Sequence, residues 1–309
     1  MKNIFTLLLL VGMIQMAEAQ DEAVFTHHAF NPTLVNPAAA GFDASEHNLF
    51  LNFRSAFSGF AGAPKNYALS YNGPVLKQIG LGAMIYSESI AGITHYRAQL
   101  SYAFNYSIED VKVALGLSTE MHRMRIDNDE LNNPLNDPDE VLQDMIDGKR
   151  AFDATAGVYA GYKDKIYVGA SFPSLVRSDL DDIAGKKEGV FSTFVFLAGG
   201  CFDVNDYKVK IQPQILIKKV RTLDLQTDIN LIASFLKEQL ITGVSYRTGT
   251  GNSAGIMLGT KYSNLRFIYS YDVYLNDFQQ YNGGSHEVTV NFEFGTGDGK
   301  FDRSKKYRK

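Results

Sequence analysis

The sequence predicts an all-β fold, a transmembrane antiparallel up-and-down β-barrel of about 14 strands. A two-residue hydrophobic rhythm recurs from Asn48 to Phe294, an export signal precedes it, and the connections between rhythmic segments alternate between long and short. A strand with one apolar and one polar face needs a different solvent on each side. In an exported chain that shows no long apolar helix, a closed barrel in a bilayer satisfies both faces and the backbone hydrogen bonds.

Residues 1–19 have the pattern of a secretory signal peptide. Lys2 precedes an apolar run from Ile4 to Ile14, and Ala17-Glu18-Ala19 ends the segment. The run is too short to span a bilayer, and small residues suit a cleavage site. We expect a mature chain that begins at Gln20, with an N-terminal periplasmic strap (20–47), the barrel (48–294) and a basic periplasmic tail (295–309).

The strands are predicted from runs of alternating or apolar residues bounded by Gly, Pro, Asn or Asp. Most are close to the roughly 9–11 residues that a tilted membrane strand needs. In chain order they are Asn48–Arg54, Asn66–Asn72, Ile79–Glu88, Thr94–Tyr106, Val111–His122, Ala151–Tyr162, Lys165–Phe172, Thr193–Asp203, Lys208–Ile217, Leu223–Leu231, Glu238–Tyr246, Ser253–Lys261, Leu265–Asp272 and Ser285–Phe294.

The alternation places charged side chains on the inner face of the predicted sheet. In the strand Leu265–Asp272, Leu265, Phe267, Tyr269 and Tyr271 face one way, with Arg266, Ser270 and Asp272 opposite. In the last strand, Val288, Val290, Phe292 and Phe294 oppose Glu287, Thr289, Asn291 and Glu293. Charges facing inward are costly in a dry sandwich core but are expected in a wet lumen. Glycines within the strands, such as Gly80, Gly116 and Gly157, are interpreted as bends in the barrel wall.

The connections carry a separate signal. Connections of two sets alternate along the chain. One set contains the long connections 55–65, 123–150, 173–192 and 273–284 and the shorter connections 89–93, 218–222 and 247–252. The connections of the other set are all short turns. Outer-membrane barrels have short periplasmic turns and longer outer loops. The alternation of long and short connections predicts that the protein lies in the cell outer membrane with both termini periplasmic.

Charge and cysteine content exclude some classes of protein. The net charge of −4 gives no support for nucleic-acid binding, and the single cysteine, Cys201, excludes an intrachain disulfide. One long connection has eight acidic residues between Asp127 and Asp147. Within it, Asp137-Pro138 and Gly148 bound a predicted short helix.

No residue pattern predicts catalysis, a metal or a cofactor. Adjacent residues of an extended strand point to opposite faces, which argues against a shared metal ion at His27-His28 and against a hydrolase triad in Ser285-His286-Glu287. The acidic stretch lacks the frame of an EF-hand. We therefore expect a protein that is not an enzyme and that binds no metal and no cofactor.

Two terminal segments are candidate partner contacts. The segment from Phe30 to Gly41 is punctuated by proline, and we expect an extended piece. It could plug or cap the periplasmic mouth of the barrel, or serve as a docking epitope; the candidate residues are Phe30, Asn31, Pro32, Asn36 and Pro37. The basic end could be a solvated tail, or contact a partner or anionic polymer through Lys305, Lys306 and Arg308.

The order and spacing of several motifs resemble one family. They are Phe30-Asn31-Pro32, Asn36-Pro37-Ala38, Arg54 with Phe57 and Phe60, Gly62-Ala63-Pro64, Gly80-Leu81-Gly82 with Gly92, Ile211-Gln212-Pro213 before Ile217-Lys218, Gly243-Val244-Ser245-Tyr246-Arg247, Tyr269-Ser270-Tyr271-Asp272 and Asn282-Gly283-Gly284-Ser285-His286-Glu287. Together they resemble the PorP/SprF family, outer-membrane proteins of the Bacteroidetes type IX secretion and gliding machinery. The resemblance covers essentially all of the mature chain, although Ala39 stands where the family often has an aromatic residue and no Trp lies near Phe57.

The resemblance implies a component that assists secretion or surface anchoring of cargo through protein–protein contacts. Its implied partners are other machinery components, a secreted adhesin-like cargo and outer-membrane lipid. The alternative is a passive or substrate-binding outer-membrane channel that uses the charged lumen as a solute path.

Overall fold

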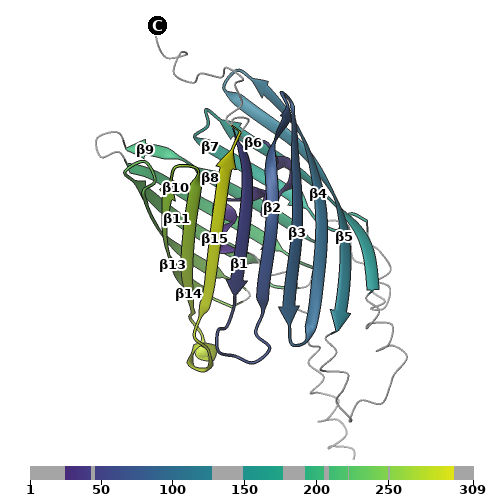
Figure 1. The fold of residues 1–309 in the computed structure, drawn as a ribbon, viewed down its shortest axis with the longest axis vertical. Coiled ribbons are helices and arrows are strands. Elements are labelled where there is room, and N and C mark those ends of the chain that lie inside the picture. The colour runs from purple at the N-terminus through teal and green to yellow at the C-terminus, as the bar shows by residue number, and fades with distance from the viewer. Residues whose placement is uncertain are drawn as a thin grey trace, which may run out of the picture.

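The computed structural model describes residues 25–42, 46–126, 149–176, 192–204, 209–221, 223–249 and 251–295. Its antiparallel strands wrap around a common interior (Figure 1). The strands are β1 (His47–Ser55), β2 (Lys65–Leu76), β3 (Ile79–Ile90), β4 (Ile93–Ile108), β5 (Val111–Ile126), β6 (Lys149–Tyr162), β7 (Ile166–Phe172), β8 (Phe194–Gly200), β9 (Phe202–Val204), β10 (Val209–Lys219), β11 (Gln226–Phe235), β12 (Leu240–Thr248), β13 (Ser253–Tyr262), β14 (Leu265–Tyr274) and β15 (Ser285–Phe294).

The sheet closes on itself, so the prediction of a barrel is confirmed. Consecutive strands pair along the chain, β1 pairs with β15, and β10 pairs with β11. Both β8 and β9 pair with β10, so they form one strand of the wall, interrupted at Cys201. In the described part of the chain the wall therefore has 14 strands, one for each predicted segment.

The predicted faces are confirmed by the burial pattern. On β15, Glu287 and Asn291 are fully buried inside, whereas Phe292 on the other face is 45% exposed. The outer face is apolar over its middle and carries aromatic side chains near both strand ends, for example Tyr96 and Tyr106 on β4. This is the distribution that a lipid-facing wall with two interfacial girdles requires.

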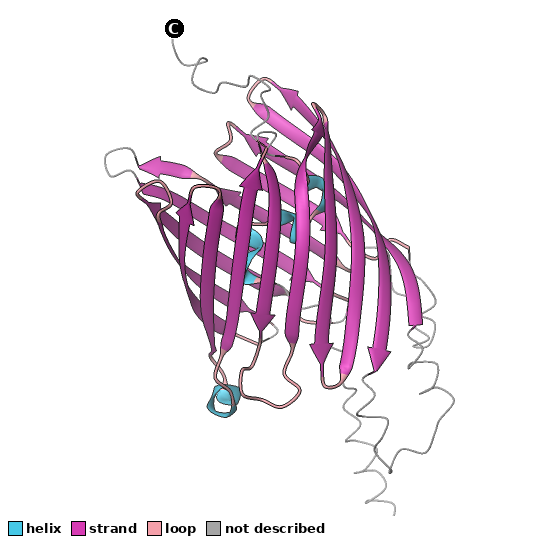
Figure 2. Cartoon of the chain, in the orientation of Figure 1, coloured by secondary structure: helices cyan, strands magenta, loops and turns pink. Residues whose placement is uncertain are grey.

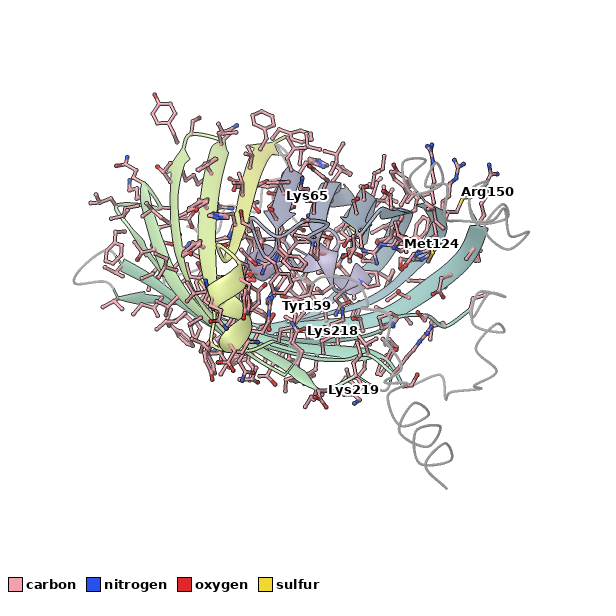
Figure 3. All side chains as sticks on the ribbon, turned by 90° about the horizontal axis from the view of Figure 1, so that it is seen from below. Lys65, Met124, Arg150, Tyr159, Lys218 and Lys219 are labelled. Atoms are coloured by element: carbon pink, nitrogen blue, oxygen red, sulfur yellow. The ribbon has the colours of Figure 1, made fainter. Side chains whose placement is uncertain are left out.

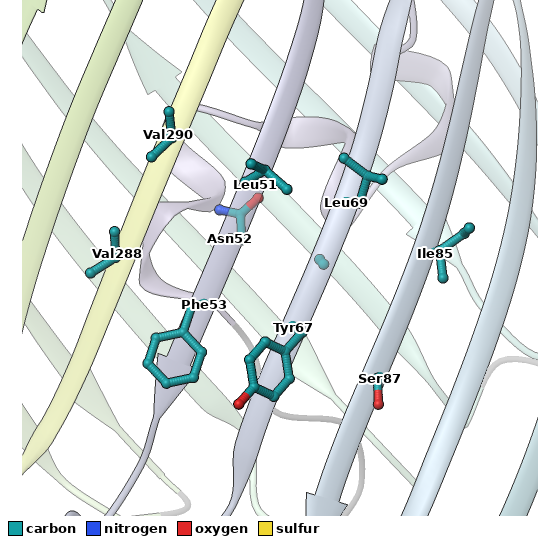
Figure 4. A pocket seen from close by; sticks show the side chains of 10 residues that line it. Leu51, Asn52, Phe53, Tyr67, Leu69, Ile85, Ser87, Val288 and Val290 are labelled. Carbon is teal, nitrogen blue, oxygen red and sulfur yellow. The ribbon is translucent and has the colours of Figure 1, made fainter.

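The outer wall also contains a shallow apolar hollow over β15, β1, β2 and β3. Its volume is about 330 Å³, and its outward side chains include Leu51, Tyr67, Ile85 and Val288 (Figure 4). Among the described residues, no helix is long and apolar enough to cross a bilayer.

The two ends of the barrel differ. The connections β2–β3, β4–β5, β6–β7, β11–β12 and β13–β14 are tight turns at one end, where His47 pairs with Phe294. The long β1–β2 and β14–β15 connections lie at the other end, where a 3-10 turn, η5 (Asp277–Tyr281), projects (Figure 2). The expected helix in residues 137–148 lies outside the described residues, as do the signal segment and the tail beyond Gly295.

Charge on the outer wall should destabilise the protein in a depth-dependent way. Leu100 lies near the middle of β4 and Tyr262 at the short-turn end of β13, and both face outward. Leu100→Arg should lower the free energy of unfolding in vesicles by about 2–4 kcal/mol, because arginine is costly at the bilayer midplane. Tyr262→Arg should cost only about 0–1 kcal/mol. Denaturant titration of the vesicle-inserted variants measures both, and equal costs would contradict a lipid-facing wall.

Candidate functional site

Of the predicted strap, residues 25–42 lie inside the barrel, and the name strap is used below for these residues. The strap contains three 3-10 turns, η1 (Thr26–Ala29), η2 (Pro32–Leu34) and η3 (Pro37–Ala39), drawn in cyan in Figure 2. The prediction of an extended piece was wrong, because proline fixes φ for the first position of such a turn. Asn36 also favours the turn, since its side-chain oxygen accepts a hydrogen bond from the Ala38 amide at 2.9 Å.

The strap runs along the barrel rather than across one mouth. The Phe42 carbonyl accepts a hydrogen bond from Lys112, the second residue of β5 at the short-turn end. The other end, at Phe25 and Thr26, contacts Tyr86 and Arg54, which lie in the long-loop halves of their strands. Residues 25–42 therefore occupy the lumen from the short-turn end to about its middle.

A buried ion cluster holds the inner end of the strap. The Arg54 guanidinium lies 2.8 Å from Asp272 Oδ2 and 2.8 Å from Glu287 Oε2. All three side chains are almost completely buried, and they come from β1, β14 and β15. Burying such charges is tolerable only when they are paired and hydrogen-bonded.

The strap backbone supplies those further hydrogen bonds. The Thr26 amide donates to Glu287 Oε2 at 2.8 Å, and the His27 amide donates to Glu287 Oε1 at 2.9 Å. The Arg54 guanidinium also donates to the Thr26 hydroxyl at 2.9 Å. One carboxylate thus binds the wall cation and two strap amides together, so the wall charges and the strap position depend on each other.

The two histidines of the strap point to different parts of the wall. His27 Nδ1 lies 2.8 Å from Thr289 Oγ1 on β15, whereas His28 Nδ1 lies 2.8 Å from the Phe25 carbonyl and its Nε2 faces Asn230 on β11. Burial lowers the pKa of both imidazoles below the ordinary value. Both imidazoles act as hydrogen-bonding groups that fix the strap.

The described residues contain no group of three or more His, Cys, Asp or Glu side chains that could hold a metal ion. The absence of a bound metal stays a prediction. In the Ser285-His286-Glu287 run, Ser285 and Glu287 face inward, while the His286 ring packs on Tyr269 and Tyr271 outside. These three residues therefore do not converge, and the prediction that the protein is not an enzyme remains a prediction.

Three apolar clusters pack the strap against separate sectors of the wall. Phe25 packs with β2 and β3, Ala29 and Phe30 pack with β11–β13, and Ala38 with Ala39 packs with β5, β6 and β8. With the ion cluster on β1, β14 and β15, these contacts surround the strap. The interior at this level is a packed core.

Several wall glycines admit the strap, a role that the sequence pattern did not predict. A Cβ on Gly116 would lie 2.2 Å from the Ala38 nitrogen, and one on Gly80 would lie 2.0 Å from the Ala40 carbonyl oxygen. A Cβ on Gly157 would lie 2.2 Å from the Asn36 side chain. No side chain fits at these points, so glycine is required by the close approach of the strap backbone at Gly80 and Gly116 and of the Asn36 side chain at Gly157.

The predicted contact residues fall into three groups. Asn31, Asn36 and Pro37 are buried inside the barrel, with Asn31 bonded to Ser70 Oγ at 2.8 Å and Asn36 bonded to the Val158 and Ala170 carbonyls. Phe30 and Pro32 are half-buried in the lumen. Lys305, Lys306 and Arg308 lie outside the described residues.

The contacts that organise this site are not visible in the sequence. The inner-face alternation placed Asp272 and Glu287 in the lumen, and Arg54 belongs to a family motif, but their mutual contact joins strands more than 200 residues apart. A second cluster, at the short-turn end, was also missed. Burial would raise the pKa of Glu238 there, but Arg266 and Lys210 hold it at about 2.

Substitution at the closest wall contact should loosen the strap. Gly116→Ala places a methyl group on the Ala38 backbone, so we expect faster amide hydrogen exchange across residues 25–42. Gly243→Ala is the matched control, because its added Cβ would meet only wall atoms, the nearest at 3.1 Å. Exchange in the strap that is equal in the two variants would contradict the tight strap–wall contact.

Removing the central cation should strongly destabilise the protein. Arg54→Met leaves two buried carboxylates without their cation, and breaking a buried ion pair costs about 3–5 kcal/mol. Combining it with Asp272→Asn and Glu287→Gln should recover much of the lost free energy of unfolding, because the stranded charges disappear. Denaturant unfolding of both variants measures this, and a triple variant no more stable than the single one would count against the charge argument.

Comparisons with known proteins agree with the architecture. The sequence model of the family described as type IX secretion system membrane protein PorP/SprF matches residues 17–292. The structure is similar to the CymD monoaromatic hydrocarbon channel, with a TM-score of 0.50, 10% identity, and coverage of 87% of this chain and 91% of that one. It is also similar to the outer membrane protein Omp33 of Acinetobacter baumannii, with a TM-score of 0.48, 7% identity, and coverage of 81% and 97%.

None of the curated protein sequences compared with this chain matches it. At 10% identity, the likeness to CymD shows only the outer-membrane barrel fold. The family match, in contrast, spans nearly the whole chain. The chain therefore belongs to the PorP/SprF family of type IX secretion system membrane proteins, and its fold is that of an outer-membrane β-barrel.

Proposed function

We propose that this protein assists the secretion or surface anchoring of cargo by the type IX secretion and gliding machinery, through protein–protein contacts. Family membership implies interaction with other machinery components. The observation that supports the proposal is that the protein's own strap packs the lumen. The lumen is therefore not an open path for solutes at this level.

The difference between the two ends of the barrel supports the proposed orientation. Short turns suit the periplasmic side and long connections suit the outer side. Gly295, the last described residue, leaves the barrel at the short-turn end, which supports a periplasmic C-terminal tail. The even number of strands places the start of β1 at the short-turn end. Because the strap precedes β1 and Phe25 lies near the middle of the lumen, the strand count alone does not assign the N-terminus to the periplasm.

The partner surface in this proposal is the short-turn end with the basic tail. Lys305, Lys306 and Arg308 belong to that tail and would contact a periplasmic machinery component or anionic polymer. The cargo would be an adhesin-like secreted protein. The strap residues Asn31 and Asn36 would act on partners indirectly, by fixing the shape of the lumen, since their side chains are bonded to the wall.

The passive channel is the alternative function, and the charged inner face favours it. Asp272, Glu287 and Arg54 would suit a polar solute path if they were hydrated, as in porins. Here they bind one another and the strap at 2.8–2.9 Å. The interior contacts therefore favour the interaction protein.

Purification from cell envelopes tests the proposal. The full-length protein should recover type IX machinery components, and a variant lacking residues 300–309 should recover them less, with the barrel intact. A variant with Lys77→Gln, Lys163→Gln and Lys237→Gln, three exposed turn lysines at the same end, is the control for loss of local positive charge. Recovery of no machinery component by the full-length protein would overturn the proposal.

Liposome swelling distinguishes the alternative. The wild-type barrel should give little sugar flux, and a variant lacking residues 25–42 should give much more, because the strap no longer fills the lumen. Heat-modifiable migration on gels confirms that both barrels are folded. Rapid flux through the wild-type barrel would favour the channel.

A further inference from the structure

One side of strand β9 has no partner strand at the short-turn end of the barrel. Among the described residues, β9 pairs with β10 alone, whereas β8, which precedes it in the same wall strand, pairs with both β7 and β10. The Cys201 amide donates to the Lys165 carbonyl at 2.6 Å, just before β7 begins. Beyond that bond, Phe202–Val204 extends past the β6–β7 turn along the rim of the barrel (Figure 1).

The unpaired backbone groups of this edge belong to Asp203. Along an antiparallel strand, the N–H and C=O groups of successive residues point alternately to the two neighbouring strands. The Cys201 amide points to β7, so the N–H and C=O of Asp203, two residues later, point to the same side. Hydrocarbon excludes such unpaired groups, so this edge must lie at the level of the lipid headgroups or beyond it, where water reaches it. An accessible strand edge is a template for pairing with another extended chain.

The two faces of β9 have different chemistry. Phe202 faces outward and is 43% exposed. Asp203 lies directly across from Lys210, and Lys210 lies directly across from Ser234, which is buried inside the barrel. Because directly opposite residues of neighbouring strands share a face, this row faces the interior. A strand added to β9 would therefore place one set of alternate side chains beside Phe202 and the other set toward the interior.

A cavity of about 420 Å³ opens on the interior side of β9. Its lining includes Asp203, Lys210, Glu238 and Lys261. The amines of the two lysines lie 2.9 and 3.9 Å from carboxylate oxygens of Glu238, so the charges of these three side chains are paired within the wall. Such a lining suits an uncharged polar side chain, which can donate and accept hydrogen bonds without adding an unpaired charge.

The strap leaves this cavity uncovered. In the part of the chain that the structure describes, none of the residues that line the cavity belongs to the strap. At the short-turn end, the Phe42 ring packs on the Tyr159 ring of β6, with the ring centroids 4.6 Å apart. Figure 3 shows Tyr159 inside the barrel. The strap thus passes this mouth beside β5 and β6, whereas the cavity lies beside β9, β10 and the β11–β12 turn.

We propose that the free edge of β9 is a docking site for an extended segment of a partner protein, which adds to the barrel wall as a further strand. The Asp203 N–H and C=O would exchange two hydrogen bonds with one residue of that segment, whose side chain faces the interior. The segment would carry uncharged polar residues on that side and apolar residues beside Phe202. The assignment rests on the proposed function for the class of partner, a machinery component on the periplasmic side.

A peptide titration tests the site with the full-length protein in detergent. The probe is a fluorescent synthetic peptide that alternates valine with threonine and glutamine, and its anisotropy measures binding. N-methylation of its polar residues should weaken binding about tenfold, because those amides face Asp203. N-methylation of its valines should leave binding unchanged, because those amides face away from the barrel. An equal loss for both methylated peptides, or no binding of the unmethylated peptide, would overturn the proposal.

Substitution of Asp203 tests the same contact from the side of the barrel. Asp203→Pro removes the edge N–H but no bond to β10, and proline is tolerated at such an edge position. Asp203→Ala is the matched control, because it removes the same carboxylate and keeps the N–H. We expect Asp203→Pro to bind the unmethylated peptide about tenfold more weakly than Asp203→Ala does. Heat-modifiable migration on gels checks that both barrels are folded, and equal affinities of the folded variants would contradict strand addition.

The partner assignment has its own measurement. In purification from cell envelopes, Asp203→Pro should recover less of the machinery components than Asp203→Ala does, and equal recovery would overturn the partner assignment. If the wild type recovers no component, the proposed function fails, while the peptide titration still decides whether β9 accepts a strand. The N-methylated peptides likewise decide the proposal on the wild-type protein alone if a variant does not fold.

Discussion

The constraint on which the structure depends is that hydrocarbon offers no hydrogen-bonding partner to a peptide group. A strand sheet in lipid must therefore have no free edge, and the β1–β15 and β10–β11 pairings remove both edges. Closure then fixes which side chains face outward and which face the interior, because residues of a strand alternate between the two faces. Phe292 faces outward for the same reason that Asn291 and Glu293 face the interior.

Closure also creates an interior that must be filled or hydrated. Here the chain fills it with its own strap, and the contacts combine apolar packing with buried charge. Glu287 joins the two kinds of contact, because it accepts hydrogen bonds from Arg54 on the wall and from two strap amides. The glycines of β3, β5 and β6 complete the arrangement by letting the strap backbone reach the wall. The inner face of the wall therefore fits this strap closely.

The candidate site was predictable only in part. The alternation showed that Asp272 and Glu287 face inward. The run from Phe30 to Gly41 suggested a segment that could plug or cap the periplasmic mouth, but its expected extended conformation was wrong. The sequence could not show that Thr26 and His27 meet Glu287, because those residues are 260 or more positions apart. The contact of the glycines with the strap could not be predicted for the same reason: a glycine that bends a strand and one that admits a second backbone look alike in the sequence until that backbone is placed.

The sequence by itself determined the architecture: the period of two fixes the strands and their faces, and the connection lengths fix which turns share an end. Those are local properties, set by which residues are apolar and which form turns. Only the tertiary structure decided what occupies the lumen and which charges pair there. Pairing depends on distances of about 3 Å between side chains of different strands, and these follow from barrel closure and strand register rather than from any local pattern.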